Sequence, residues 1–112
     1  MDDYERQARP LYCFYVADGR LVAETHWYYG LEARQRTYEK TYLRFRRNGK
    51  RMLLDYDRLD RYLNGYLYTF IKDRDKALNI MRSAVKNRVD ALRYELEDAE
   101  KALAAIDAAM DM

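Results

Sequence analysis

The spacing of apolar positions along this chain predicts two β-hairpins followed by helix. Between residues 11 and 26, two runs of strand-forming residues flank Asp18-Gly19, a dipeptide that supplies the two positive φ angles of a type I′ turn. Folding the chain about this turn gives an antiparallel hairpin with one apolar face. The expected cross-strand pairs are Val16 with Leu21, Phe14 with Ala23, and Tyr12 with Thr25.

A second hairpin is predicted about Asn48-Gly49, which carries the same turn signal. The expected pairs are Phe45 with Met52 and Leu43 with Leu54 on an apolar face, and Arg46 with Arg51 on the reverse face. Between the two hairpins, the strand is expected to extend through the aromatic residues 27–29 to Gly30, and residues 31–36 to form a turn or a single helical turn. Residues 1–10 are polar and are expected to form a flexible N-terminal arm.

Basic residues are concentrated on and around the second hairpin. Residues 31–56 carry eight basic and three acidic side chains. Like charges directly opposite each other destabilise a strand pair, so this arrangement indicates a surface for an anionic partner. An alternative is that the cations keep the edge of the sheet from pairing with another chain. The candidate binding residues are Tyr42, Arg44, Arg46, Arg47, Lys50 and Arg51.

From Asp57 onward the apolar residues recur at helical spacing. Residues 57–70 carry the stripe Leu59, Leu63, Tyr66, Leu67 and Phe70, which predicts a short helix. Residues 71–110 repeat apolar positions every seven residues, which predicts a long coiled-coil-type helix. The charged run 72–76 either forms a turn between the two helices or continues a single one, and in a further alternative the short helix folds back as a helical hairpin. The expected dimer seam is Leu78, Val85, Val89, Leu92, Leu96, Leu103 and Ile106.

A seam of this length exceeds what a small sheet can cover, so another chain is expected to bury it. Basic residues flank its first half, whereas residues 95–112 carry one basic and six acidic side chains. An antiparallel second copy places the basic half against the acidic half, and a parallel copy places like charges together. The sequence therefore predicts an antiparallel homodimer.

Together these patterns predict an α+β fold: a small antiparallel sheet of two β-hairpins, a short helix, and a long C-terminal coiled-coil-type helix or a helical hairpin. The 112 residues leave room for one domain, and with 49% apolar residues the chain can form a core. The domain is expected over residues 11–112, with the hairpins in residues 11–56 and the helices in residues 57–112.

The residues available for chemistry are few. The chain holds a single cysteine, Cys13, and a single histidine, His26, which are expected on one face of the first hairpin without a third group to complete a catalytic site. These are too few ligands for a structural zinc site, and no glycine-rich phosphate loop is present. We therefore expect a non-enzymatic protein that uses no metal and no cofactor. The lone cysteine and the lack of a long apolar window favour a cytoplasmic protein without a membrane partner.

Tyrosine is the most conspicuous part of the composition, with twelve residues. Such a surface suits stacking on nucleobases and docking on a protein equally well. The first hypothesis is a small DNA- or RNA-binding protein that uses the basic hairpin and dimerises through its helix, although the pI of about 8.6 is below the value typical of such domains. The alternative is a protein-binding adaptor or inhibitor, of phage or mobile-element type, that docks its tyrosine-rich, charged surface on a larger host protein.

Overall fold

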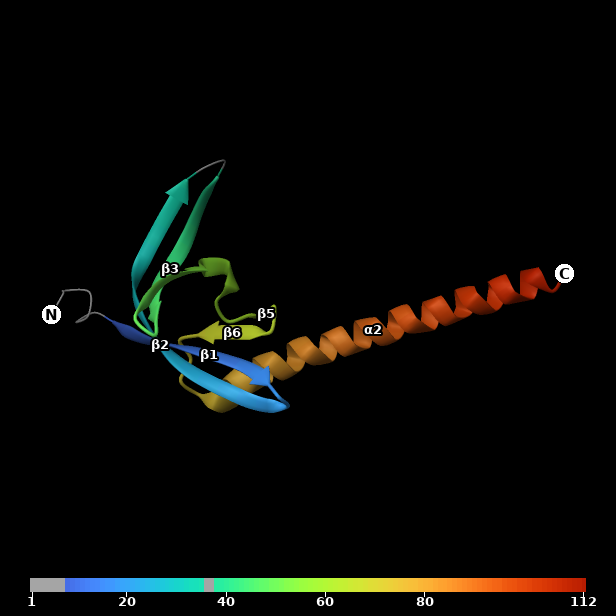
Figure 1. Ribbon diagram of the computed structural model, residues 1–112, viewed down its shortest axis with the longest axis horizontal. Helices are drawn as coiled ribbons and strands as arrows, with labels where there is room; N and C mark the ends of the chain where they lie inside the picture. The colour runs from blue at the N-terminus through green and yellow to red at the C-terminus, as the bar shows by residue number, and fades with distance from the viewer. Residues whose placement is uncertain (1–7, 36–37) are drawn as a thin grey trace. The chain divides into compact units, whose positions relative to one another are not determined.

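The computed structural model describes residues 8–35 and 38–112, which form a six-stranded antiparallel sheet and a long α-helix (Figure 1). The strand order across the sheet is β4-β3-β2-β1-β6-β5. Strand β1 pairs with β2, β2 with β3, and β3 with β4, whereas β6 pairs with β1 and β5 pairs with β6. In chain order the elements are β1 (Arg9–Ala17), β2 (Arg20–Gln35), β3 (Glu39–Arg47), β4 (Lys50–Asp55), the short 3-10 helix η1 (Tyr56–Arg58), β5 (Tyr62–Leu63), β6 (Tyr66–Thr69) and α2 (Arg74–Met110).

Both predicted hairpins are present with the predicted registers. Asp18 and Gly19 have φ angles of 53° and 73°, and Asn48 and Gly49 have φ angles of 50° and 78°, as type I′ turns require. The observed pairs include Val16 with Leu21, Phe14 with Ala23, Phe45 with Met52, Leu43 with Leu54, and Arg46 with Arg51. The N-terminal arm predicted for residues 1–10 is wrong at Arg9 and Pro10, which belong to β1, and its residues 1–7 lie outside the described residues.

The expectation of a turn or helical turn over residues 31–36 is wrong for residues 31–35, because β2 continues to Gln35 and pairs with β3 along that length, and residue 36 lies outside the described residues. A β-bulge lies between Tyr28 and Gly30, so that Tyr29 is the extra residue of β2. Gly30 has a φ of 146°, which an L residue rarely adopts. Beyond the bulge, Leu31 pairs with Leu43 and so rejoins the apolar face.

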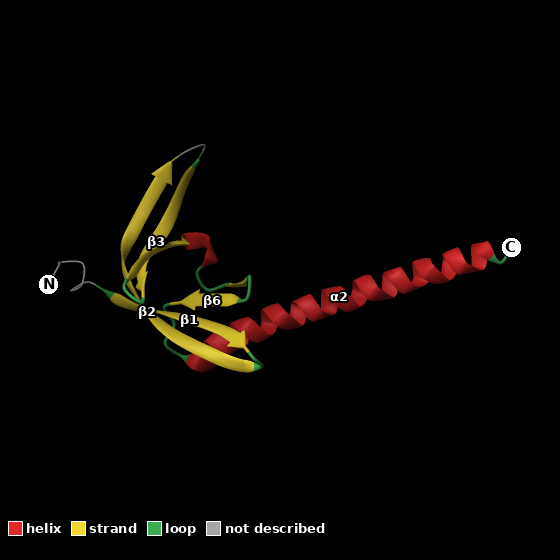
Figure 2. Cartoon of the chain, viewed as in Figure 1, coloured by secondary structure: helices red, strands yellow, loops and turns green. Residues whose placement is uncertain are grey.

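The short helix predicted over residues 57–70 is also wrong. Only the 3-10 turn η1 is helical there, and β5 and β6 follow it as a small hairpin (Figure 2). Asn64 and Gly65 have φ angles of 52° and 86°, so they form the same kind of turn as the two larger hairpins. Asp55 caps η1 by accepting a hydrogen bond from the backbone nitrogen of Asp57 at 3.0 Å. The apolar stripe therefore belongs to short strands.

Two clusters of buried side chains lie on opposite faces of the sheet, since alternate residues of a strand point to opposite sides. One cluster consists of Leu11, Leu43, Phe45 and Leu54, with Tyr28, Leu59 and Tyr68 packed against it. The other consists of Phe14, Leu67, Ala77 and Met81, with Leu78 and Ile80 among the partly buried residues around it. The first two turns of α2 thus cover one face of the sheet at β1 and β6.

Helix α2 begins within the charged run 72–76, and no helix precedes it in the described chain apart from η1. The Asp73 carboxylate caps it by accepting hydrogen bonds from the backbone nitrogens of Asp75 and Lys76, at 3.0 and 3.4 Å. The chain divides into two compact units, and the boundary between Met81 and Arg82 falls inside α2. The predicted fold class is therefore wrong: one continuous six-stranded sheet and a single long helix replace the two hairpins, the short helix and the coiled-coil-type helix or helical hairpin.

Candidate functional site

A glycine at the β2 bulge determines where the Arg44 side chain can lie. Arg44 is opposite Gly30 in the β2–β3 register, and a Cβ atom on Gly30 would be 2.9 Å from Nη2 of Arg44. The missing side chain therefore lets this guanidinium lie close to the backbone of β2. Its Cζ atom is 5.2 Å from the ring centroid of Tyr29, and the Cζ atom of Arg46 is 5.5 Å from the same centroid. Both distances are typical of cation–π contacts.

These side chains open into a basic hollow on the face formed by β2, β3 and β4, which we call the arginine pocket. Its volume is about 430 Å³. Arg46 is directly opposite Arg51 in the β3–β4 register, so their charges are adjacent. Glu32 is the acidic residue of the lining, and its carboxylate accepts a hydrogen bond of 2.9 Å from Nε of Arg34. The residues that line the pocket are Tyr29, Glu32, Arg34, Arg44, Arg46, Arg51, Met52 and Leu53.

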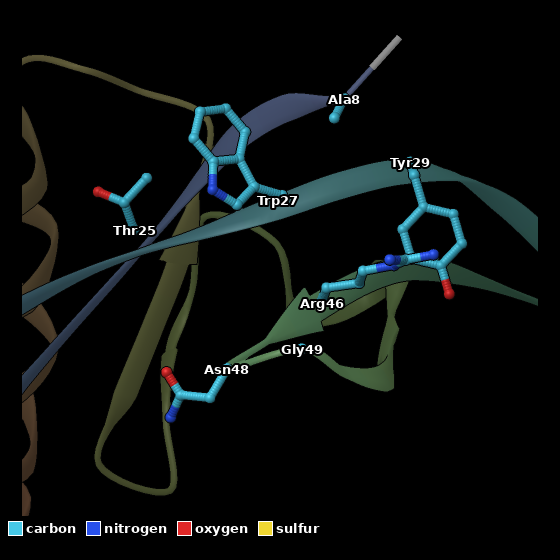
Figure 3. A pocket seen from close by; sticks show the side chains of 7 residues that line it. All are labelled: Ala8, Thr25, Trp27, Tyr29, Arg46, Asn48 and Gly49. Atoms are coloured by element: carbon cyan, nitrogen blue, oxygen red, sulfur yellow. The ribbon is translucent and has the colours of Figure 1, made fainter. Parts of the chain in front are cut away.

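A second hollow of about 570 Å³, which we call the Trp27 pocket, adjoins the first because Tyr29 and Arg46 line both. Trp27 lies opposite Arg46 in the strand register, and its side chain is 52% exposed. Figure 3 shows that Trp27 and Tyr29 both come from β2, that the Arg46 guanidinium lies beside the ring of Tyr29, and that Asn48 follows at the end of β3. The residues that line the pocket are Ala8, Thr25, Trp27, Tyr29, Arg46, Asn48 and Gly49.

The structure brings four of the six predicted binding residues to one face and separates the other two. Tyr42, Arg44 and Arg46 alternate along β3, and Arg51 faces Arg46 from β4, so all four share the face of the arginine pocket. The ring centroid of Tyr42 is 5.8 Å from Cζ of Arg34. Arg47 and Lys50 pair with each other on the opposite face, where Nη2 of Arg47 is 3.6 Å from the carboxylate of Glu24. The basic hairpin therefore has two chemically different sides.

Sequence reasoning missed Trp27, Tyr29 and Arg34 as members of this site. A strand without a bulge would put odd and even positions on opposite faces, so Trp27 and Arg34 would not share one. The bulge at Tyr29 shifts the alternation by one residue and joins them on the same face. A glycine within an aromatic and charged strand is the signal that could have indicated such a bulge.

Cys13 and His26 share one face of the first hairpin, as predicted, but both are deeply buried, with 2% and 5% exposure. Burial is the main cause that raises the pKa of the Cys13 thiol. Burial also lowers the pKa of His26 below its usual value of 6.5, against the opposing effect of Glu24, whose Oε2 lies 3.2 Å from Nε2 of the imidazole. Both groups are consequently neutral near pH 7, and a neutral thiol is a poor nucleophile.

The predicted dimer seam divides between the two units of the chain. Leu78 lies in the first unit and packs against the cluster formed by Phe14 and Leu67. The other seam residues lie in the second unit, residues 82–112. Their exposed fractions range from 39% at Val89 to 59% at Leu103. Those exposed positions are Val85, Val89, Leu92, Leu96, Leu103 and Ile106.

Within residues 8–35 and 38–112, no group of three or more His, Cys, Asp or Glu side chains is placed to hold a metal ion. Across the same ranges, no helix combines the length and the apolar character needed to cross a membrane. No protein-family model, curated protein or solved structure matches this chain.

Proposed function

We propose that this protein binds nucleic acid through the arginine pocket and acts as a binding protein without catalytic activity. The observation that carries the proposal is the convergence of Arg34, Arg44, Arg46 and Arg51 on one hollow face. Guanidinium groups donate planar, paired hydrogen bonds that match phosphate oxygens, and phosphate contacts supply most of the affinity for nucleic acid. The aromatic rings of Tyr29 and Tyr42 beside these guanidiniums suit contact with bases.

The position of the arginines argues against a purely protective role. Cations that keep a sheet from pairing with another chain belong on its edge strands, which here are β4 and β5. Arg44 and Arg46 lie on β3, between β2 and β4, where no edge needs protection. Arg46 and Arg51 are directly opposite each other, and like charges in that position destabilise a strand pair.

A second candidate function is that of a protein-binding adaptor or inhibitor, of the phage or mobile-element type. The 38% exposure of Leu53 favours it, because Leu53 pairs with Arg44, lines the arginine pocket and would be buried by a protein surface. The proposed setting for either function is the cytoplasm, where the free and buried Cys13 would stay reduced.

A salt titration tests the nucleic-acid proposal. Binding of a labelled single-stranded oligonucleotide, followed by fluorescence anisotropy, should weaken with a log–log slope of about −0.7 for each phosphate contact, or about −2 to −3 for the arginine pocket. The variant Arg46→Glu with Arg51→Glu should abolish binding. A matched control is Arg20→Glu with Lys50→Glu, which changes the net charge equally at exposed positions outside both pockets.

Two results would contradict the proposal. Equal loss of binding in the control variant would mean that net charge, and not the arginine pocket, attracts the oligonucleotide. Failure of single-stranded and duplex DNA and RNA to bind at about 50 mM salt would leave the protein-binding candidate, which capture of a partner by wild type but not by the pocket variant would then support.

We also propose that two copies associate through antiparallel pairing of residues 85–110. If Leu96 of one copy packs beside Ala99 of the other, the remaining layers pair Leu92 with Leu103, Val89 with Ile106 and Val85 with Met110. Every layer is then apolar over about 38 Å of helix. The exposure of these side chains in the isolated chain supports the proposal, since contiguous apolar surface of this kind marks an interaction site.

The flanking charges select the antiparallel sense. In that pairing Arg93 lies beside Glu100 of the second copy, and Lys86 lies beside Asp107, so both contacts are attractive. In a parallel pairing Glu95 lies beside Glu100 of the second copy, and Arg88 lies beside Arg93, so both are repulsive. Exposed pairs contribute only tenths of a kcal/mol each, yet they are enough to choose between orientations.

One charge reversal tests this orientation, because the two pairings predict opposite changes in the affinity of the dimer. Glu100→Lys should weaken an antiparallel dimer and strengthen a parallel one, and Arg93→Glu in the same chain should restore the antiparallel dimer. Sedimentation equilibrium measures each dissociation constant, with Tyr94→Glu, away from the seam, as the control for added charge. Wild type that stays monomeric at millimolar concentration, or a dimer that Glu100→Lys strengthens, would contradict the proposal.

A further inference from the structure

The Trp27 pocket combines features that the phosphate contacts of the arginine pocket do not require. Trp27 and Tyr29 supply aromatic surfaces, Arg46 supplies a planar cation, and Asn48 supplies an amide that can donate and accept hydrogen bonds. The volume of about 570 Å³ lies within the range of clefts that bind small molecules. A hollow lined in this way is suited to a flat ring with polar edges.

We infer that the Trp27 pocket holds one unstacked nucleobase of a single strand whose phosphates lie in the arginine pocket. The inference rests on the proposed nucleic-acid binding and names the form of nucleic acid that it concerns. The two hollows share Tyr29 and Arg46, so a base in one and its neighbouring phosphates in the other lie in contiguous space. Bases stack on aromatic rings and guanidinium planes, and the amide of Asn48 can pair with a base edge.

A base pocket of this kind favours a single strand over a duplex. A base must leave its stack to enter a hollow between Trp27 and the turn at Asn48. In a duplex this costs both pairing and stacking, whereas in a single strand the base is already accessible. The arginine pocket alone gives no such preference, because duplex and single-stranded nucleic acid both present phosphates. Preference for a single strand is therefore a property of the Trp27 pocket.

The experiment uses the intrinsic fluorescence of Trp27, the single tryptophan of the chain. The probes are a single-stranded oligonucleotide, a duplex of the same length, and an abasic single strand with the same number of phosphates. We expect the single strand to quench Trp27 and to bind more tightly than the other two. Trp27→Ala should weaken binding of the single strand by about 5- to 150-fold and leave the affinity for the abasic strand unchanged.

Two further variants serve as controls for Trp27→Ala. Trp27→Phe keeps an aromatic ring in the pocket and should retain most of the affinity for the single strand, which shows that the ring supplies the affinity. Unchanged binding of the abasic strand by Trp27→Ala shows that this variant is folded. Tyr56→Ala removes a ring that is 51% exposed and lines neither pocket, and it should bind as wild type does.

The outcomes separate this inference from the proposed function. Equal loss of single-stranded and abasic binding in Trp27→Ala, or binding of the duplex as tight as that of the single strand, overturns the base pocket and leaves nucleic-acid binding standing. Binding of the single strand without quenching of Trp27 does the same. Failure of all three probes to bind overturns both.

Discussion

Replacing Gly30 with alanine perturbs the fold and the arginine pocket through one methyl group. Gly30 has a φ of 146°, and an L residue held in such a region costs about 1–3 kcal/mol. Alanine also lowers the conformational entropy of the unfolded chain, which stabilises the folded protein by about 0.4–1 kcal/mol and offsets part of this cost. The new Cβ would be 2.9 Å from Nη2 of Arg44, but this atom ends a flexible side chain and can move away at little cost. We expect a net loss of about 1–2 kcal/mol in the free energy of unfolding.

The same methyl group should lower affinity for nucleic acid, because it displaces the Arg44 guanidinium from the backbone and from Tyr29. The loss of one phosphate contact should make the salt slope for single strands shallower by about 0.7. Gly30→Ala should therefore lose no further affinity in a chain that already carries Arg44→Ala. The effects of the two substitutions on stability should instead be close to additive, since most of the cost of Gly30→Ala is backbone strain.

Urea unfolding followed by circular dichroism measures the stability of both single variants and the double variant, and anisotropy measures their affinities. Gly19→Ala is the matched control, because Gly19 also has a positive φ, of 73°, but its Cβ would meet no atom within 4 Å. The control should lose stability and keep its affinity for nucleic acid. If Gly30→Ala retains wild-type affinity, or if it weakens binding further in the Arg44→Ala background, Gly30 does not position Arg44.

Two more predictions concern the core. Leu67→Ala should lower the free energy of unfolding by about 2–5 kcal/mol because Leu67 is fully buried beside Phe14, whereas Leu63→Ala, at a 41% exposed position, should cost less than about 1 kcal/mol. Acidification from pH 7.5 to 5.5 should lower stability, because burial depresses the pKa of His26 and the unfolded chain gains a proton near pH 6.5 that the folded protein does not take up. Urea unfolding at both pH values would detect this, and a stability that rises on acidification, or an equal loss in His26→Gln, would contradict it.

The turns could be predicted from sequence because their chemistry is local. Asp18-Gly19 and Asn48-Gly49 specify both the turn type and the register of the strands beside them, and both registers are observed. Asn64-Gly65 carries the same signal, but the strands on either side, β5 and β6, have only two and four residues. Alternation over so few positions cannot be distinguished from helical spacing, so the apolar stripe predicts a helix where the chain forms two short strands.

The candidate site was only partly predictable because it depends on a shift of register within β2. Alternation along β3 correctly grouped Tyr42, Arg44 and Arg46, since that strand is regular. The contribution of β2 depends on one extra residue at Tyr29, whose presence is a property of the paired strands and not of either alone. The pairing of β6 with β1 is likewise a contact between segments far apart in the chain, which local patterns do not encode.

The boundary between the two units falls within a continuous helix, between Met81 and Arg82, and this has a consequence for proteolysis. Proteases usually separate units at exposed loops, where the backbone already fits the active site of the protease. Here trypsin can cut at Arg82, Lys86 or Arg88 only after the helix has unwound around them. The rate of tryptic cleavage in this segment therefore measures how often the C-terminal unit opens, and it should fall with increasing protein concentration if two copies hold each other closed.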